Sequence, residues 1–168
     1  MVQVINNFLQ NNEFHSIYKI ITSDFFPWYL QKYKVFNEDN QTQFTHNLVK
    51  KYKDETKTSF YVTPILSPLL RELKAKDVVR SKINLTYRTD KAIESLAHTD
   101  VSKIDLNDPS KTAILYMNTN NGYTQIVGGE KIKSIQNRLV VFPTNTSHFG
   151  VTHTDIEHRL VLNLVYKT

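Results

Sequence analysis

The sequence of 168 residues contains no cysteine and only four glycines. The lack of cysteine excludes disulfides and thiolate metal sites, so any metal must be bound by His, Asp or Glu. No apolar run is long enough to cross a bilayer, and no basic segment followed by an apolar one comes after Met1. We therefore expect neither a membrane span nor a secretion signal. The absence of cysteine agrees with a location in a reducing cytoplasm.

The remaining composition is that of an ordinary globular protein, with 40% hydrophobic and 22% charged residues. The length fits one domain. We expect a single domain over residues 1–168, with helical N-terminal support over about 1–77 and a β core over about 78–168. Asn, Lys and Ile are abundant and Gly and Ala are scarce, as in proteins from AT-rich genomes, which points to a virus (and then to a host cytoplasm) or a marine microbe.

The net charge of +5 leaves two interpretations open. One is a basic surface that is simply solvated, and the other is a surface that attracts nucleic acid or an anionic small molecule. The basic residues are dispersed, and the sequence contains no arginine-rich stripe and no DNA-reading motif. Nucleic acid is therefore not the partner that we expect, although the charge alone does not exclude it.

The patterning changes near Val78, from mixed to mainly strand-like. Before this point, apolar residues recur at helical spacing over about 13–23 and 64–76, and two short pieces, 44–49 and 60–62, resemble strands. After it, strands are predicted over 79–87, 112–118, 123–127, 130–135, 138–142, 149–152 and 158–166. The Asn-Gly pair in 119–122 and the pair Gly128-Gly129 predict hairpin turns. The pattern favours a mainly β sandwich or jelly roll with flanking N-terminal helices.

Four scattered polar residues form the candidate site: His98, Asp100, His148 and Arg159. In an extended segment the side chains of His98 and Asp100 project to the same side and can reach one ion. Two histidines and one carboxylate on one face of a metal suit non-haem Fe(II). Each residue also has an ordinary explanation: His98 and Asp100 as a surface pair, His148 as a loop histidine and Arg159 as a solvated strand end.

Taken together, these residues resemble the signature of the Fe(II)- and 2-oxoglutarate-dependent dioxygenases. The segments Thr112–Asn118 (TAILYMN) and Asn137–Pro143 (NRLVVFP) are similar to the prolyl 4-hydroxylase-like branch of that superfamily. The similarity covers about 79–166, roughly half of the chain. It implies a double-stranded β-helix, a jelly-roll barrel like that of the cupins, with supporting helices.

The resemblance also implies roles for individual residues. His98, Asp100 and His148 would be the iron ligands, Arg159 would pair with the distal carboxylate of 2-oxoglutarate, and Tyr116 would add a hydroxyl to the same carboxylate.

Other positions are less well defined by the resemblance. His153 and His158 compete with His148 for the role of distal ligand, and spacing favours His148. Tyr87 is a weaker candidate for lining the co-substrate pocket. Some relatives carry serine where this chain has Val161, and Thr124 is one possible substitute. Two further residues, Asn84 and Asn163, lie on flanking strands and could point into the barrel.

The implied activity is hydroxylation of an unactivated C–H bond with decarboxylation of 2-oxoglutarate to succinate and CO2. The cofactors would be Fe(II), 2-oxoglutarate and O2, with ascorbate as a possible addition. The substrate would be a peptide, a protein or a small molecule, and the branch favours a peptidyl proline. The alternatives are a free amino acid, another metabolite or a nucleobase, or a non-catalytic jelly roll that binds a partner, in a protein that is a monomer or homodimer. A cupin-type enzyme fits less well, because such sites use more histidines and glycine-rich motifs.

Overall fold

A computed structural model of the chain describes residues 1–34, 41–53, 55–100 and 109–168. Over these residues it contains eleven strands and two helices, so the prediction of a mainly β protein is confirmed. Neither of these helices is long and apolar enough to span a bilayer. The elements in chain order are β1 (Gln3–Ile5), α1 (Asn11–Ile21), β2 (Tyr29–Gln31), β3 (Gln43–Lys51), β4 (Thr56–Thr58), α2 (Val62–Leu73), β5 (Asp77–Tyr87), β6 (Lys111–Tyr116), β7 (Tyr123–Ile126), β8 (Lys131–Lys133), β9 (Arg138–Pro143), β10 (His148–Val151) and β11 (His158–Lys167).

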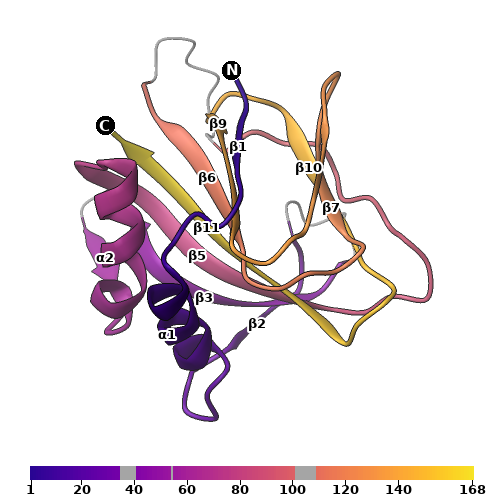
Figure 1. The fold of residues 1–168 in the computed structure, drawn as a ribbon, viewed down its shortest axis with the longest axis horizontal. Coiled ribbons are helices and arrows are strands. Elements are labelled where there is room, and N and C mark those ends of the chain that lie inside the picture. Colours follow the sequence, from indigo (N-terminus) through magenta and orange to yellow (C-terminus); the bar gives the residue numbers. More distant parts are fainter. Residues whose placement is uncertain (35–40, 54, 101–108) are drawn as a thin grey trace.

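The described strands form two antiparallel sheets. The larger sheet has the order β1-β9-β6-β11-β5-β3-β2, with β4 added to β3, and the smaller one has the order β10-β7-β8. The long strands β5 and β11 pair along almost their whole length at the centre of the larger sheet. The two helices lie on one side of this sheet, and β7 and β10 lie on the other (Figure 1).

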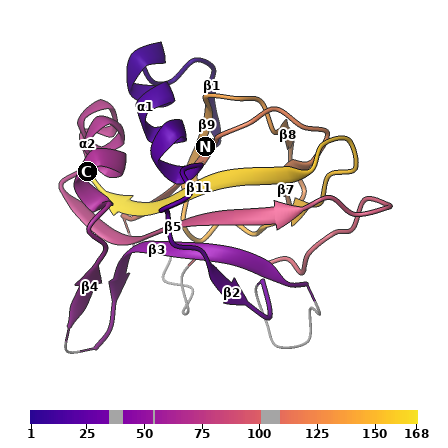
Figure 2. The ribbon, with the colours of Figure 1, turned by 90° about the horizontal axis from the view of Figure 1, so that it is seen from below.

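The strict alternation of side chains along the central strands explains this layering. On β11, Leu160, Leu162 and Leu164 belong to the main core, together with buried residues from α1 and α2. Their neighbours Arg159, Val161 and Asn163 point to the opposite face, where the smaller sheet lies. Figure 2 shows α1 and α2 above the larger sheet, whose outer face they cover.

A second, smaller core fills part of the space between the two sheets. It contains the inward-facing residues of β6 and β9, which pack against Ile126 of β7 and Ile132 of β8. The remaining space between the sheets is a cavity, lined from one side by β5, β6 and β11 and from the other by β7 and β10. The fold thus places the polar faces of the two long strands β5 and β11 along one cavity that is open to solvent.

Most of the predicted elements are present, and two predictions are wrong. The segment 60–62 is not a strand, because Phe60 and Tyr61 form a turn and α2 begins at Val62. The Asn-Gly pair in 119–122 does not make a tight hairpin, since β6 and β7 lie in different sheets and the chain crosses between them here. By contrast, Gly128 adopts a φ of 69° in the predicted turn between β7 and β8.

The N-terminal part contributes more strands than expected. Residues 1–77 supply β1 to β4 in addition to α1 and α2. Three of these strands have only three residues each, and β1 and β2 lie at the two ends of the larger sheet. The residues of β1, β2 and β4 show no alternation of apolar and polar side chains that would mark them as strands.

Candidate metal centre and active-site cavity

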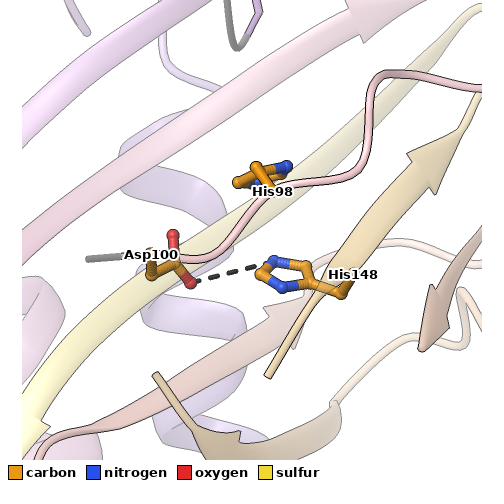
Figure 3. Close-up of side chains that lie close together, drawn as sticks. All are labelled: His98, Asp100 and His148. Carbon is orange, nitrogen blue, oxygen red and sulfur yellow. Dashed lines mark ion pairs between the residues drawn. The ribbon is translucent and has the colours of Figure 1, made fainter. Parts of the chain in front are cut away.

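The structure brings His98, Asp100 and His148 together at the cavity (Figure 3). One ligand atom of each residue lies within 4.8 Å of those of the other two. His98 pairs with His148 in an isolated antiparallel bridge, with backbone hydrogen bonds of 3.0 and 2.9 Å. The backbone N–H of Asp100 donates to the carbonyl of Thr144 at 3.1 Å. The segment before β6 is therefore fixed against β10, and the two ligand-bearing segments are held in register.

Both histidines present the same ring nitrogen to the centre of this group. The Nδ1 of His98 lies 3.2 Å from the carbonyl oxygen of Leu96, and the Nδ1 of His148 lies 3.0 Å from that of Thr146. Because a carbonyl only accepts, each Nδ1 must carry the proton, which leaves the Nε2 lone pair free. Backbone contacts of this kind orient metal-binding histidines.

Asp100 is held in its ionised form by two neighbours. Arg80 on β5 donates a charged hydrogen bond to one carboxylate oxygen, and the Thr112 hydroxyl donates to the other at 2.7 Å. Burial acts to raise the pKa of Asp100, but the charge of Arg80, the proximity of His148 and the Thr112 hydrogen bond together outweigh it and lower that pKa below its usual value. The Nε2 of His148 lies 3.8 Å from the same carboxylate.

The electrostatic environment also keeps His98 neutral. Burial, followed by the proximity of His148, lowers the pKa of the His98 imidazole below its ordinary value of 6.5. A neutral imidazole and an ionised carboxylate are the protonation states that a divalent metal requires of its ligands. Ligand atoms held at about 2.0–2.2 Å from one first-row ion lie closer together than 4.8 Å, so the three side chains would approach one another on binding it.

Arg159 is a buried cation at the same cavity, with only 8% of its surface exposed. Its Nε donates to the Ser134 hydroxyl at 2.8 Å, and its guanidinium lies 5.7 Å from the centre of the Tyr116 ring. Over the described residues no carboxylate forms an ion pair with it, and burial lowers its pKa. A buried charge without a counter-ion is costly, so the site is short of one anion.

The two predicted helpers of Arg159 lie beside it, whereas Tyr87 does not. The buried Tyr116 hydroxyl donates to the Thr124 hydroxyl oxygen at 2.8 Å, and Thr124 lines the cavity. Tyr87 is 62% exposed, has its ring against Phe44 and lies outside the cavity lining. Val161, at the position where some relatives carry serine, lines the cavity with an apolar side chain.

The structure separates His148 from its two sequence competitors. His153 is fully buried and has no hydrogen-bond partner for either ring nitrogen over the described residues, but it does not belong to the His-Asp-His group. His158 begins β11 opposite Tyr87 and is likewise outside the group.

The cavity has a volume of about 630 Å³, which is within the usual range for small-molecule sites. Arg80, Lys82, Asn84 and Thr86 of β5 line it, as does Asn163 of β11.

Three residues that contact the predicted site residues were not predicted from the sequence: Arg80, Thr112 and Ser134. The alternation of polar residues along β5 was the available signal for Arg80, whereas nothing in the sequence marks Ser134.

Comparisons with known proteins identify the fold. No protein-family model and no curated protein matches the sequence. Solved structures do match the structure of the chain. An oxidoreductase of the 2OG-Fe(II) oxygenase family from Burkholderia pseudomallei superposes with a TM-score of 0.70 at 10% identity, covering 99% of this chain and 84% of that one. The chain has the fold of the 2OG-Fe(II) oxygenases.

Prolyl hydroxylases share this oxygenase fold. A prolyl-4-hydroxylase from Pseudomonas putida matches with a TM-score of 0.60 at 11% identity, over 99% of this chain and 92% of that one. A prolyl hydroxylase from Trichoplax adhaerens, solved in complex with a hypoxia inducible factor peptide, matches with a TM-score of 0.61 at 11% identity, over 99% and 83%. The oxygenase fold therefore accounts for nearly the whole chain.

Proposed function

We propose that the chain is an Fe(II)- and 2-oxoglutarate-dependent dioxygenase that hydroxylates an unactivated C–H bond. One observation carries the proposal: a His-Asp-His group and a buried arginine without a carboxylate partner line the same cavity. A two-histidine, one-carboxylate set with open positions is typical of non-haem Fe(II) oxygenases. The oxygenase fold of the chain supports the assignment.

In this proposal the residues of the chain hold and orient the reactants. His98, Asp100 and His148 would bind Fe(II), with Arg80 and Thr112 keeping Asp100 ionised and correctly turned. Bound iron and 2-oxoglutarate would together use O2 to convert 2-oxoglutarate into succinate and CO2 and to place one oxygen atom in the substrate C–H bond. Ascorbate is a possible addition, as a reductant that keeps the iron in the Fe(II) state.

Arg159 would bind the distal carboxylate of 2-oxoglutarate. Its Nε is used by Ser134, so the rest of the guanidinium fork is available for a carboxylate. The Tyr116–Thr124 hydrogen bond lies next to it and would supply a hydroxyl to the same carboxylate. The exposed Tyr87 has no part in this arrangement.

We further propose that the two sheets are the halves of a double-stranded β-helix. The cavity between the larger sheet and the sheet β10-β7-β8 is where such a barrel holds its active site. This topology would explain why β6 and β7, which are consecutive in sequence, lie in opposite sheets.

The substrate that we propose first is a peptidyl proline. The structural neighbours include prolyl hydroxylases, and one of these was solved with a peptide. A free amino acid, a small metabolite or a nucleobase remains the alternative, and the cavity is large enough for a small molecule beside 2-oxoglutarate.

Anaerobic addition of Fe(II) and 2-oxoglutarate tests the reaction class. We expect a weak visible metal-to-ligand band, followed by succinate once O2 is admitted. The Asp100→Ala variant should show neither, whereas Asp90→Ala, which changes an exposed aspartate outside the cavity, should behave like the wild type. A wild-type protein without the band and without succinate would support a non-catalytic jelly roll instead.

A further inference from the structure

The cavity has a second polar wall, and apart from Arg80 the proposed chemistry does not use its residues. Along β5, Arg80, Lys82, Asn84 and Thr86 alternate on the inner face and line the cavity. On the neighbouring strand β11, Asn163 lies opposite Lys82 and also lines the cavity. Burying such a row of polar residues in the central strand of a sheet costs free energy unless these groups form hydrogen bonds or ion pairs.

Of the three cations that line the cavity from β5 and β11, Lys82 is the one without an assigned anion. Arg80 forms an ion pair with Asp100, and Arg159 is assigned to 2-oxoglutarate. Over the described residues, Lys82 makes no hydrogen bond and no ion pair. Once Fe(II) and 2-oxoglutarate are bound, their charges cancel, and the positive charge of Lys82 would remain unmatched.

The surroundings of Lys82 favour an anion. Burial, followed by the charge of Arg80, lowers the pKa of its ammonium group from 10.5 to about 8, and Lys50 on β3 acts in the same direction. Asp100 opposes this effect but is already paired with Arg80. The ammonium group is therefore still mainly protonated at pH 7, in a region where positive charges outnumber negative ones.

Asn84 supplies an independent sign of a missing ligand. Its side-chain oxygen Oδ1 is buried and has no hydrogen-bond partner over the described residues. Asn84 lies two residues from Lys82, so the two side chains project from the same face of β5 into the cavity. A buried acceptor without a donor costs about 1–3 kcal/mol, and this cost would be removed by a ligand that carries an N–H or O–H group.

We propose that Lys82 and Asn84 form a carboxylate-recognition site for the substrate that is hydroxylated. The substrate would place a carboxylate at Lys82 and a hydrogen-bond donor at Asn84, with the C–H bond to be oxidised facing the His-Asp-His group. The carboxylate belongs either to a free amino acid or to an acidic side chain of a peptide. This inference rests on the proposed oxygenase function, and it makes Lys82 a specificity-determining residue of the same cavity.

Acid and amide pairs provide the test, with protein loaded with Mn(II) and 2-oxoglutarate and binding measured by calorimetry. One pair is L-proline and L-prolinamide, and the other is acetyl-Pro-Glu-amide and acetyl-Pro-Gln-amide. We expect the acid of one pair to bind at least tenfold more tightly than its amide. A preference in the first pair identifies a free amino acid, and a preference in the second identifies an acidic peptide.

Three variants connect that preference to Lys82. Lys82→Met keeps the length of the side chain and removes its buried charge, and it should abolish the preference. Lys82→Arg retains the charge and should keep it, which also guards against misfolding of the first variant. Lys57→Met removes an exposed charge from β4, outside the cavity, and should leave the preference unchanged.

The outcomes separate this inference from the proposed function. Equal binding of acid and amide in both pairs, or a preference that survives in Lys82→Met, overturns the inference. A loss of 2-oxoglutarate affinity in Lys82→Met would assign the residue to the co-substrate, which also overturns the inference but leaves the oxygenase function intact. A wild-type protein that binds neither Mn(II) nor 2-oxoglutarate overturns the proposed function itself.

Discussion

Arg159 shows at the scale of one residue how a site can be incomplete without a ligand. Its guanidinium is buried, its pKa is lowered by burial, and the described part of the chain offers it a hydroxyl and an aromatic ring but no carboxylate. Arginine presents a planar fork that matches a carboxylate. The residue is therefore prepared for an anion that the described residues do not supply.

Replacing Arg159 with methionine should weaken 2-oxoglutarate binding. Hydrogen bonds to charged groups contribute about 1.5–3 kcal/mol, so the Kd should rise about tenfold to a hundredfold. Anaerobic titration of 2-oxoglutarate into the Fe(II) protein measures this change. Arg88→Met, at an exposed position just after β5, is the control and should bind normally. An unchanged Kd in Arg159→Met would remove Arg159 from the co-substrate site.

Lys82 should make stability depend on pH in the alkaline range. Its pKa is lowered from 10.5 to about 8 by burial and by Arg80, with Lys50 adding to the effect and Asp100 opposing it. Between these two values the unfolded chain holds the proton more tightly, so stability rises as the pH increases from about 8. The drop in pKa corresponds to about 3 kcal/mol.

Urea unfolding of the wild type and of Lys82→Met at several pH values from 7 to 10.5 checks this prediction. The difference in unfolding free energy should change in favour of the wild type by up to about 3 kcal/mol across the range. Other lysines and tyrosines titrate in both proteins and cancel in the difference. Parallel curves would show that Lys82 titrates normally.

Single residues of the site could be predicted only where a pattern marks them. His98 and Asp100 are two residues apart, and His148 follows a segment with the pattern of a buried strand. The proximity of the three side chains could therefore be predicted. Contacts that depend on packing between distant strands could not. Ser134 meets Arg159 across 25 residues, and this contact is set by how the two sheets face each other.

At the scale of elements, strand β11 organises both layers of the molecule. It pairs with β5 on one side and β6 on the other, and its alternate residues serve the main core and the cavity. The long strands and both helices could be predicted because their periodicity extends over several residues. The three-residue strands β1, β2 and β4, and the turn at Phe60, depend on pairing with distant partners and leave no such pattern.

The crossing between β6 and β7 depends on Gly122. A Cβ at this position would lie 2.9 Å from the Asn120 side-chain oxygen, 3.0 Å from the Val151 carbonyl and 3.2 Å from the Cβ of His153. The φ of Gly122 is not positive, so its backbone conformation does not require glycine. Glycine is required here because its neighbours approach too closely for a Cβ. The glycine of the Asn-Gly pair therefore serves the close packing of this crossing and not a hairpin turn.

Gly122→Ala should therefore destabilise the protein by about 1–3 kcal/mol, the usual cost of overpacking. Urea unfolding measures the change. Gly150→Ala is a matched control, because its nearest neighbours lie at 3.9 Å, an ordinary contact distance. If both variants lose the same stability, the close approach at Gly122 has no special energetic role.

At the scale of the whole molecule, the residues of the proposed metal centre come from both sheets. His148 begins β10 of the smaller sheet, while His98 and Asp100 lie in the segment that follows β5 of the larger one, and Arg80 anchors Asp100 to β5 itself. An ion bound by all three residues would join the two layers. Such an ion favours the folded state, since the unfolded chain does not assemble the site.

Mn(II) should consequently raise the unfolding temperature. At a hundredfold excess over its Kd the gain is about 2.7 kcal/mol, which corresponds to about 5–10 °C for a chain of this size. Thermal unfolding followed by circular dichroism, with Mn(II) or with EDTA, measures the shift. Asp100→Asn should lose it and Asp90→Asn, at an exposed position, should keep it. An equal shift in both variants would place the ion elsewhere.

The two faces of β5 have a consequence for how this protein can diverge or be engineered. Its outer residues Ile83 and Leu85 pack under the helices, and its backbone is paired on both sides by β11 and β3. Lys82 and Asn84 point away from that packing and into the cavity. Substitutions at these two positions therefore change the polar groups that line the cavity without disturbing the packing of the sheet. A library of variants restricted to them is the smallest one that we expect to yield proteins that accept a different molecule.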